Sequence, residues 1–341
     1  GLTLAAVILV GGLLIRAGLR GVTVGVVSAF MLYTRRFFEP LRQTANVYNL
    51  IQSALAGAER LADVLSVEPG MEAEAGAAPG LLRGDVEFRD LHFSYKSGQP
   101  VLDGVTLRVS AGEMIAVVGP TGAGKTTLVA LLNRLYDPGG GSVLVDGRDI
   151  RGLDLRGYRQ QLGVVLQEPF FFSGTVRENL RYGRLDASDA EVESAAQAAH
   201  ADAVIRALPR GYETELTERG ANLAQGERQL LAIARAVLAN PRILILDEAT
   251  SGIDSLTEAR IQRGLHTLLS GRTSFVIAHR LSTVRAADRV VVINDHRIAE
   301  EGTHDSLLKR DGVYARLYRM QQGKAETVTV SEFQRSLAQA G

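Results

Sequence analysis

The sequence of 341 residues has no cysteine and no excess of charge of either sign, since 38 Lys and Arg balance 38 Asp and Glu. The lack of cysteine excludes disulfide bonds, thiolate nucleophiles and cysteine-based zinc sites, and it fits a reducing compartment. A nucleic-acid-binding domain is normally basic, so the neutral balance argues against nucleic acid as a partner. With 46% hydrophobic and 22% charged residues the chain is not disordered, and its length suits two domains.

Apolar runs of membrane-spanning length are also missing, yet the first 34 residues contain only two charges, Arg16 and Arg20. The uncharged runs 1–15 and 21–34 are each shorter than the ~18–20 residues of a spanning helix, which leaves two buried core segments as one interpretation. We favour a helical hairpin in lipid. The chain begins in mid-run with Gly rather than Met, and the second run continues without a turn signal to Pro40. No signal-peptide pattern follows, so we expect a membrane protein cut upstream.

Four segments follow from the pattern along the chain. Residues 1–68 are predicted as a partial transmembrane domain, made of the two membrane helices of the hairpin and a cytosolic helical extension. Apolar residues recur at three- and four-residue steps from Leu41 to Leu65 and continue the second helix beyond a bilayer. Residues 69–83, rich in Gly, Pro, Ala and Glu, read as a linker. Residues 84–322 form a soluble α/β domain, and 323–341 are a polar tail with a weak helical pattern.

The segment Gly119–Thr127 (GPTGAGKTT) matches the phosphate-binding pattern G-x-x-x-x-G-K-[ST]. The preceding MIAVV run, 114–118, predicts a buried strand, and 126–136 predicts a helix. Glycines let successive N–H groups curl toward phosphate oxygens, and the helix adds its positive end. Lys125 can reach the terminal phosphates and the Thr126 hydroxyl can ligate Mg²⁺. The residues expected around the phosphates are Gly119, Pro120, Thr121, Gly122, Ala123, Gly124, Lys125, Thr126 and Thr127.

A second apolar strand is predicted at 242–246, followed by Asp247 and Glu248. Carboxylates at the carboxyl end of a parallel strand lie where ligands bind in open α/β sheets. Asp247 suits a contact to Mg²⁺, and Glu248 suits a general base for the attacking water. Acids at strand ends are often only helix caps, so the phosphate-binding segment is what favours this interpretation.

Several further motifs occur in a fixed order. They are Tyr95 in FSYKSGQPVL, Gln167 in VVLQEPFFFSGTVRENL, Glu218–Gly220 (ERG), Leu223–Glu227 (LAQGE) before RQLLAIARA, Ser251–Asp254 (SGID), and His279 in FVIAHRLSTV. With these motifs the sequence resembles the ATP-binding cassette (ABC) family, specifically exporters whose membrane and nucleotide-binding domains share one chain. The resemblance covers nearly all of 1–322. It implies an α/β P-loop NTPase domain of ABC type with a helical subdomain, preceded by all-α transmembrane helices.

The resemblance also implies roles for the motif residues. Tyr95 stacks on adenine, Gln167 contacts Mg²⁺ and water and links the domain to the membrane helices, and His279 contacts the γ-phosphate. Catalysis is thereby assigned to Glu248, His279, Lys125 and Gln167, and metal binding to Thr126, Gln167 and Asp247. Two such domains enclose two ATP molecules head to tail, and the residues then supplied to the partner's site are Leu223, Ala224, Gln225, Gly226, Glu227 and Asp254.

The implied activity is ATP-driven export across the inner (cytoplasmic) membrane by a multi-pass protein with its nucleotide-binding domain in the cytoplasm. ATP and Mg²⁺ are the implied cofactors, and the implied partners are the lipid bilayer, a second half-transporter and a drug-like or lipid-like substrate. A soluble ABC ATPase would lack residues 1–65, an importer ATPase would be a separate chain, and a P-loop kinase gives no reason for LAQGE or His279.

The LAQGE segment departs from the family pattern, which has Ser where this chain has Ala224 and Gln where it has Glu227. A lost hydrogen bond to a charged acceptor costs ~1–3 kcal/mol, and a carboxylate near an incoming phosphate repels it. We therefore hypothesise a heterodimer in which this half keeps the intact Glu248. Neutral drift within a homodimer is the alternative.

Charged residues follow the second apolar run at Arg35, Arg36, Glu39 and Arg42. In a helix that enters lipid near Val22, Arg35 lies ~20 Å along it. Such groups either face a substrate pathway or form an interfacial anchor.

Overall fold

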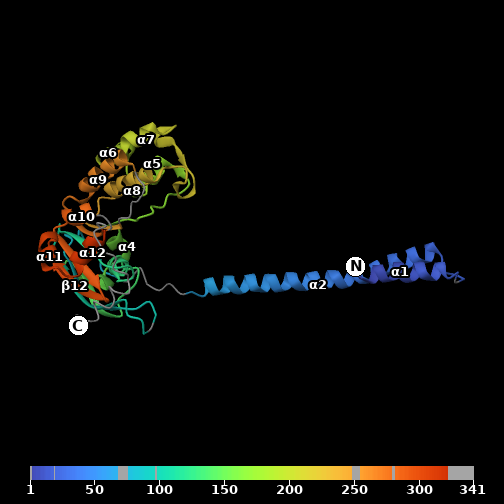
Figure 1. Cartoon of the computed structure of the whole chain (residues 1–341). Helices are drawn as coiled ribbons and strands as arrows, with labels where there is room; N and C mark the ends of the chain where they lie inside the picture. Colours follow the sequence, from blue (N-terminus) through green and yellow to red (C-terminus); the bar gives the residue numbers. More distant parts are fainter. Residues whose placement is uncertain are drawn as a thin grey trace. The chain divides into compact units, whose positions relative to one another are not determined.

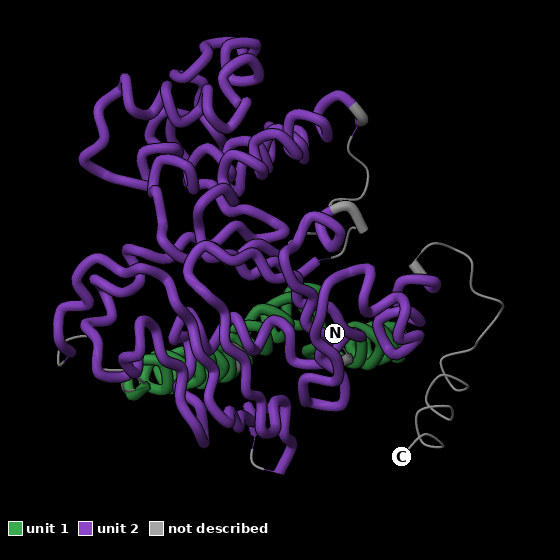
Figure 2. The backbone as a smooth tube through the Cα atoms, turned by 90° about the vertical axis from the view of Figure 1, so that its left-hand side faces the viewer, with its two compact units in different colours: residues 1–72 green, residues 73–341 purple. Residues whose placement is uncertain are grey.

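The computed structural model describes residues 2–18, 20–67, 76–96, 98–247, 254–278 and 281–321. The chain divides into two compact units, residues 1–72 and residues 73–341, shown in separate colours in Figure 2. The polar tail beyond residue 321 lies outside the described residues.

The first unit is the helical hairpin that the two apolar runs predict. Helix α1 (Leu2–Arg16) packs against the start of helix α2 (Val24–Leu65), as Figure 1 shows. The Thr23 side chain caps α2 by accepting a hydrogen bond from the Val26 N–H at 3.3 Å. A Cβ at Gly11 would lie 2.7 Å from Val27 Cγ2, so the glycine permits this close contact.

Large apolar side chains remain exposed along both helices, Leu9, Phe30 and Phe37 among them. Arg35 and Arg36 lie within α2 and are also exposed. In the part of the chain that is described, no helix combines the length and the apolar character needed to cross a membrane.

The second unit is built on a six-stranded sheet. Its strands, in spatial order, are β12 (Arg297–Gly302), β11 (Arg289–Asn294), β3 (Met114–Val118), β10 (Thr273–Ile277), β9 (Ile243–Asp247) and β6 (Leu162–Val165). Strand β12 is antiparallel to its neighbour and the other pairs are parallel. Almost all residues of the central strands are buried, which is why they read as continuous apolar runs.

A second, antiparallel sheet has the strand order β2 (Leu102–Val109), β1 (Val86–Phe93), β4 (Gly140–Val145) and β5 (Arg148–Asp149). One hydrophobic core joins residues of the two sheets, with the Phe88 and Phe275 rings edge to face at 5.9 Å. Strands β7 (Gly174–Thr175) and β8 (Glu215–Leu216) form a separate two-stranded ribbon.

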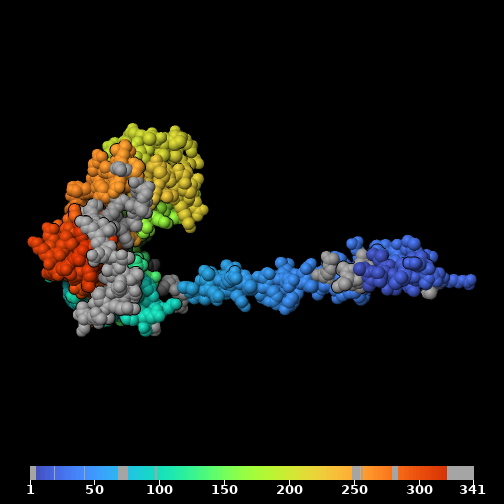
Figure 3. Space-filling view, viewed as in Figure 1, coloured from blue at the N-terminus to red at the C-terminus, as the bar shows by residue number. Residues whose placement is uncertain are grey.

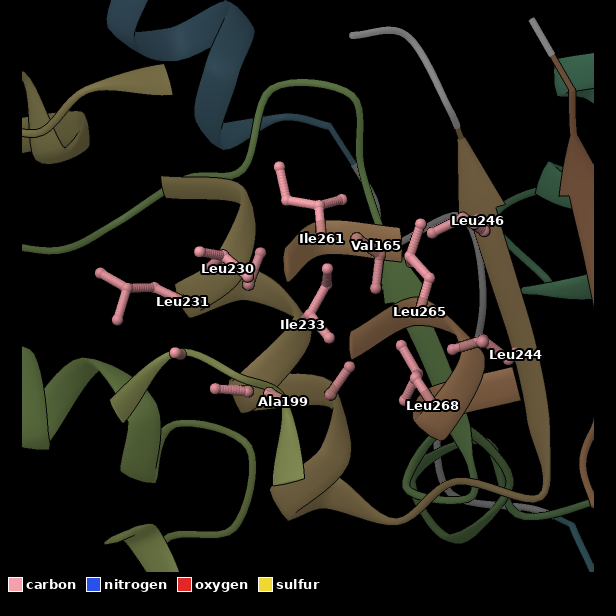
Figure 4. Packing of buried hydrophobic residues seen from close by; sticks show 14 of the residues in the cluster. Val165, Ala199, Leu230, Leu231, Ile233, Leu244, Leu246, Ile261, Leu265 and Leu268 are labelled. Carbon is pink, nitrogen blue, oxygen red and sulfur yellow. The ribbon is translucent and has the colours of Figure 1, made fainter. Parts of the chain in front are cut away.

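Two helices of the second unit, α3 (Lys125–Leu132) and α4 (Leu155–Arg159), contribute to the core that joins the two sheets. The other helices contribute to a second core, and they are α5 (Val176–Arg181), α6 (Asp189–Ala198), α7 (Asp202–Ala207), α8 (Gln225–Ala239), α9 (Ser255–Leu269), α10 (Leu281–Ala286), α11 (His304–Arg310) and α12 (Val313–Gln321). Figure 4 shows Leu230 and Ile233 of α8 packed toward Ile261, Leu265 and Leu268 of α9. Helices α6 and α7 form a helical lobe, yellow in Figure 3, at the opposite end of this unit from β12.

Element boundaries follow the expected pattern with one clear difference. Helix α3 ends at Leu132 rather than at Tyr136, because Arg134 takes a positive φ of 50° that stops the helix. The described residues of the expected linker pack on the second unit. Leu82 is buried, and the Ala77 N–H donates to the Gly152 carbonyl at 2.9 Å.

Candidate nucleotide-binding site

The loop from β3 to α3 is wrapped tightly against the sheet. Gly119 and Gly124 have φ values of 155° and 101°, which other residues rarely adopt. A Cβ would lie 2.2 Å from the Ile293 carbonyl oxygen at Gly119, and 2.8 Å from the Val101 carbonyl oxygen at Gly124. Gly124 is the N-cap of helix α3 and has no side chain that could cap it, so the first N–H groups of the helix are left for an anion.

Lys125 folds its ammonium back over this loop. Its Nζ donates to the carbonyl oxygens of Gly119 at 2.9 Å and Pro120 at 2.8 Å. Burial lowers the pKa of Lys125 below its usual range, and the charge of Asp247 acts in the opposite direction. The cation is therefore held near the loop by neutral oxygens, in a position that favours an incoming phosphate.

Asp247 and Gln167 lie at the same edge of the sheet. Strand β10 separates β3 from β9, and Asp247 is in register with Ile277 at the end of β10. Asp247 is half-buried, while Gln167, just beyond the end of β6, is exposed. Glu248 and His279, which follow β9 and β10 in sequence, lie outside the described residues.

The donor set fits a magnesium ion bound together with a triphosphate. Thr126 offers an exposed hydroxyl and Asp247 a carboxylate, and Mg²⁺ is usually held by one or two carboxylates plus substrate phosphates. Within the described ranges no group of three or more His, Asp or Glu side chains could hold a metal alone. Phosphate oxygens would have to complete the coordination.

Tyr95 lies in the loop after β1 and is 53% exposed. Its hydroxyl is 3.2 Å from Thr127 Oγ1 in the phosphate-binding helix, and Thr127 itself is buried. The Tyr95 ring is therefore tied to α3 and keeps aromatic surface open to a planar ligand.

The LAQGE segment opens helix α8, with Leu223 and Gly226 buried and Ala224 and Gln225 exposed. Ala224 is the N-cap but has no side-chain acceptor, and the Glu227 carboxylate accepts a hydrogen bond from the Ala224 N–H at 2.8 Å. An intramolecular carboxylate thus lies at the helix end to which the resemblance assigns a phosphate.

Asp254 caps helix α9. Its Oδ1 accepts hydrogen bonds from the N–H groups of Leu256 at 3.1 Å and Thr257 at 3.0 Å. The Thr257 N–H bond is the main reason why the pKa of Asp254 lies below its usual range. Residues Ser251–Ile253 of the same motif lie outside the described part of the chain.

Two hollows beside Gln167 were not predicted from the sequence. A cavity of about 480 Å³ is lined by Gln167, Gln225, Arg219 and Arg228 among others. A larger groove of about 810 Å³ adjoins it, with Arg156, Arg159, Phe170, Phe172, Tyr182 and Arg235 in its wall. Several lining residues belong to the motifs around Gln167, Arg219 and Gln225, but these motifs lie far apart in the sequence, so their meeting at one surface could not be predicted from it.

The fold and the glycine-wrapped loop define a P-loop nucleoside-triphosphate-binding domain. Residues 102–251 match the protein family described as ABC transporter. Residues 102–251 of the chain are therefore a domain of the ABC transporter family.

Relatives extend this similarity over most of the chain. An uncharacterized ABC transporter ATP-binding protein, YfiC of Bacillus subtilis, is 49% identical over 92% of this chain and 52% of its own length. A fatty acid ABC transporter ATP-binding/permease protein of Mycobacterium bovis is 46% identical over 92% of this chain and 49% of its own length. The chain thus spans about half the length of the curated relatives it matches.

Comparison with solved structures also finds similarity to an ABC exporter. The structure of a bacterial Atm1-family ABC exporter with ATP bound has a TM-score of 0.73 and 38% sequence identity, covering 90% of this chain and 54% of the other. The helical hairpin and the α/β domain are therefore similar to about half of that exporter chain.

Proposed function

We propose that this chain is the nucleotide-binding half of an ABC exporter subunit that hydrolyses ATP with Mg²⁺ and drives export across the cytoplasmic membrane. The observation that carries the proposal is the loop between β3 and α3. It combines uncapped helix N–H groups with the Lys125 ammonium, close to Asp247 at the carboxyl edge of the sheet. This arrangement binds the phosphates of a nucleotide.

Each proposed catalytic residue has a separate task. Lys125 and the loop N–H groups hold the terminal phosphates, and bound Mg²⁺ would neutralise charge on them from Thr126 and Asp247. Glu248 takes a proton from water as that water attacks the γ-phosphorus and the bond to the β-phosphate oxygen breaks. Gln167 orients the water and His279 contacts the γ-phosphate.

The transport role rests on the first unit and on the groove. Exposed apolar side chains along α1 and α2 indicate contact with lipid or with other helices, and the relatives include an ATP-binding/permease protein. We infer that residues 1–68 end a multi-pass membrane domain and that the 810 Å³ groove receives one of its cytosolic loops. The fatty acid transporter among the relatives favours a lipid-like substrate over a drug-like one.

Replacing Glu248 by glutamine tests the hydrolytic part of the proposal. General-base catalysis supplies ~10²- to 10⁴-fold, so ATP turnover should fall by at least that lower factor while ATP affinity stays unchanged. Phosphate release and equilibrium ATP binding are measured on the same preparation. The control is Glu87→Gln, which removes a carboxylate paired with Arg89 on β1 and should keep full turnover. Unchanged turnover in Glu248→Gln would refute the assigned base.

We further propose a heterodimer as the working assembly. The support is local: Glu227 satisfies the Ala224 N–H with its own carboxylate, and Ala224 lacks the hydroxyl that would bind a phosphate. In the head-to-tail dimer, the LAQGE segment of this chain completes the ATP site of the partner, and we expect that site to be the weaker one. The corresponding segment of the partner completes the ATP site formed by the phosphate-binding loop of this chain.

The double substitution Ala224→Ser/Glu227→Gln should therefore activate the protein when it is purified alone. It restores a hydroxyl donor and removes the repelling charge, and hydrogen bonds to charged groups contribute ~1.5–3 kcal/mol, so kcat/KM for ATP should rise about tenfold or more. Vanadate-sensitive ATPase is compared with that of the unaltered protein, and thermal unfolding checks α8. Robust turnover of the unaltered chain by itself would contradict the heterodimer.

A further inference from the structure

Two half-exposed tyrosine rings meet at a right angle beside the phosphate-binding helix. Tyr95 is 53% exposed and Tyr136 is 45% exposed, and their ring centroids lie 5.2 Å apart at an interplanar angle of 87°. The buried ring of Phe93 supports both, at 4.9 Å from Tyr95 and 5.6 Å from Tyr136. We propose that Tyr136 is a positioning residue that fixes the Tyr95 ring for the nucleotide base and forms the second wall of the base site.

The backbone around Tyr95 does little to fix its ring. Tyr95 lies in an exposed loop, closed by a hydrogen bond from the Val101 N–H to the Phe93 carbonyl at 2.8 Å. The side chain is held instead by the hydroxyl contact to Thr127 and by the two neighbouring rings. Removing one ring therefore removes one of three contacts that define the stacking surface.

Tyr136, by contrast, belongs to a rigid turn. Arg134, which is 7% exposed, pairs with Asp137 at 3.1 Å and donates to the Ile150 carbonyl at 3.3 Å, so ion-paired residues flank Tyr136 on both sides. The Leu135 N–H also donates to the Ala130 carbonyl at 2.9 Å. This turn continues directly from α3, so the Tyr136 ring is fixed relative to the phosphate site.

The two rings together fit a planar base joined to phosphates. A base stacked on the open face of Tyr95 meets the Tyr136 ring at its edge, which is a favoured arrangement of aromatic groups. Aromatic pairs of this kind contribute enough to change an affinity by about 3- to 10-fold. The phosphates are held by the loop, so only ligands that carry a base should depend on Tyr136.

This inference rests on the proposed ATP binding, and the experiment separates the two. Titration calorimetry of the whole chain compares MgATP with magnesium tripolyphosphate, which has the phosphates but no base. We expect Tyr136→Ala to bind MgATP about 3- to 10-fold more weakly and tripolyphosphate unchanged, and Tyr136→Phe to bind both like the unaltered chain. In steady state the Ala variant should raise KM and leave kcat unchanged.

Matched variants define the outcome. Tyr182→Ala removes an equally exposed ring, 54% exposed and stacked on Phe172 at 4.5 Å, and should not change MgATP affinity. Adding Tyr136→Ala to Tyr95→Ala should cost less than the sum of the two single changes, because Tyr136 acts partly by fixing the Tyr95 ring. Equal weakening for tripolyphosphate, or a Phe variant as weak as the Ala variant, overturns the role of Tyr136. An unaltered chain that binds neither ligand instead overturns the proposed function.

Discussion

Replacing Lys125 with alanine should abolish ATP turnover and weaken ATP binding by more than about 100-fold, the largest effect we expect from a single side chain. The ammonium already lies over the phosphate-binding loop, 2.9 Å from the Gly119 carbonyl oxygen and 2.8 Å from that of Pro120. Bound phosphates gain a charge-assisted contact there. Phosphate release and calorimetric titration with MgATP measure the two losses.

The control for this change is Lys309→Ala, which removes an exposed lysine of helix α11 and should leave turnover unaltered. Urea unfolding tests whether the Lys125 variant remains folded, since it loses two hydrogen bonds to backbone carbonyls. A folded Lys125→Ala protein that still hydrolyses ATP at a tenth of the normal rate would show that the loop does not bind phosphate as proposed.

Lys125 also gives the site a pH dependence with a defined sign. Because burial lowers its pKa in the folded protein below the ordinary 10.5, the unfolded chain binds this proton more tightly. The free energy of unfolding therefore gains from this group as pH rises through the window between the lowered pKa and 10.5. ATP affinity should fall in the same window as the ammonium loses its proton, and this fall should be absent from Lys125→Ala.

The phosphate-binding strand and the second buried strand could both be predicted from the sequence. Strand β3 has the predicted bounds, and strand β9 (Ile243–Asp247) lies one residue further along the chain than the predicted 242–246. These elements are local: each is a short apolar run or an amphipathic repeat with turn residues beside it. The phosphate-binding segment could also be predicted, because the spacing of its glycines and of the Lys-Thr pair lies within nine consecutive residues.

The features that could not be predicted join residues far apart in the chain. Nothing in the sequence places Tyr136 beside Tyr95, and the early end of α3 comes from the packing of Arg134 against the Ile150 carbonyl. Long-range packing of this kind overrides local propensity.

In the first unit the sequence predicted the helical hairpin, but it did not identify what packs against the hairpin. Helix α2 follows the predicted continuous pattern from Val24 to Leu65. The apolar residues that would pack against other helices or lipid are instead exposed, as at Leu9 and Phe30. A pattern of apolar residues indicates that a face is to be buried and does not identify what buries it.

Substituting Gly119 by alanine should cost more stability than any other single methyl group added to the phosphate-binding loop. Its Cβ would lie 2.2 Å from the Ile293 carbonyl oxygen, a backbone atom of strand β11 that cannot rotate away. Either β3 and β11 separate or the loop shifts, and we expect a loss of about 3 kcal/mol or more in the free energy of unfolding. Because the shifted loop no longer directs its N–H groups at one point, MgATP binding should be lost as well.

Gly122→Ala is the matched control, because Gly122 also has a positive φ, of 82°, but no atom lies within 4 Å of the position of its Cβ. That variant incurs only the backbone strain of a left-handed alanine, ~1–2 kcal/mol, with no collision. Urea unfolding and MgATP titration of both proteins separate the two effects. Equal loss of stability in the two variants would mean that glycine is required in this loop only because of the positive φ. The close contact between the loop and β11 would then contribute nothing to the site.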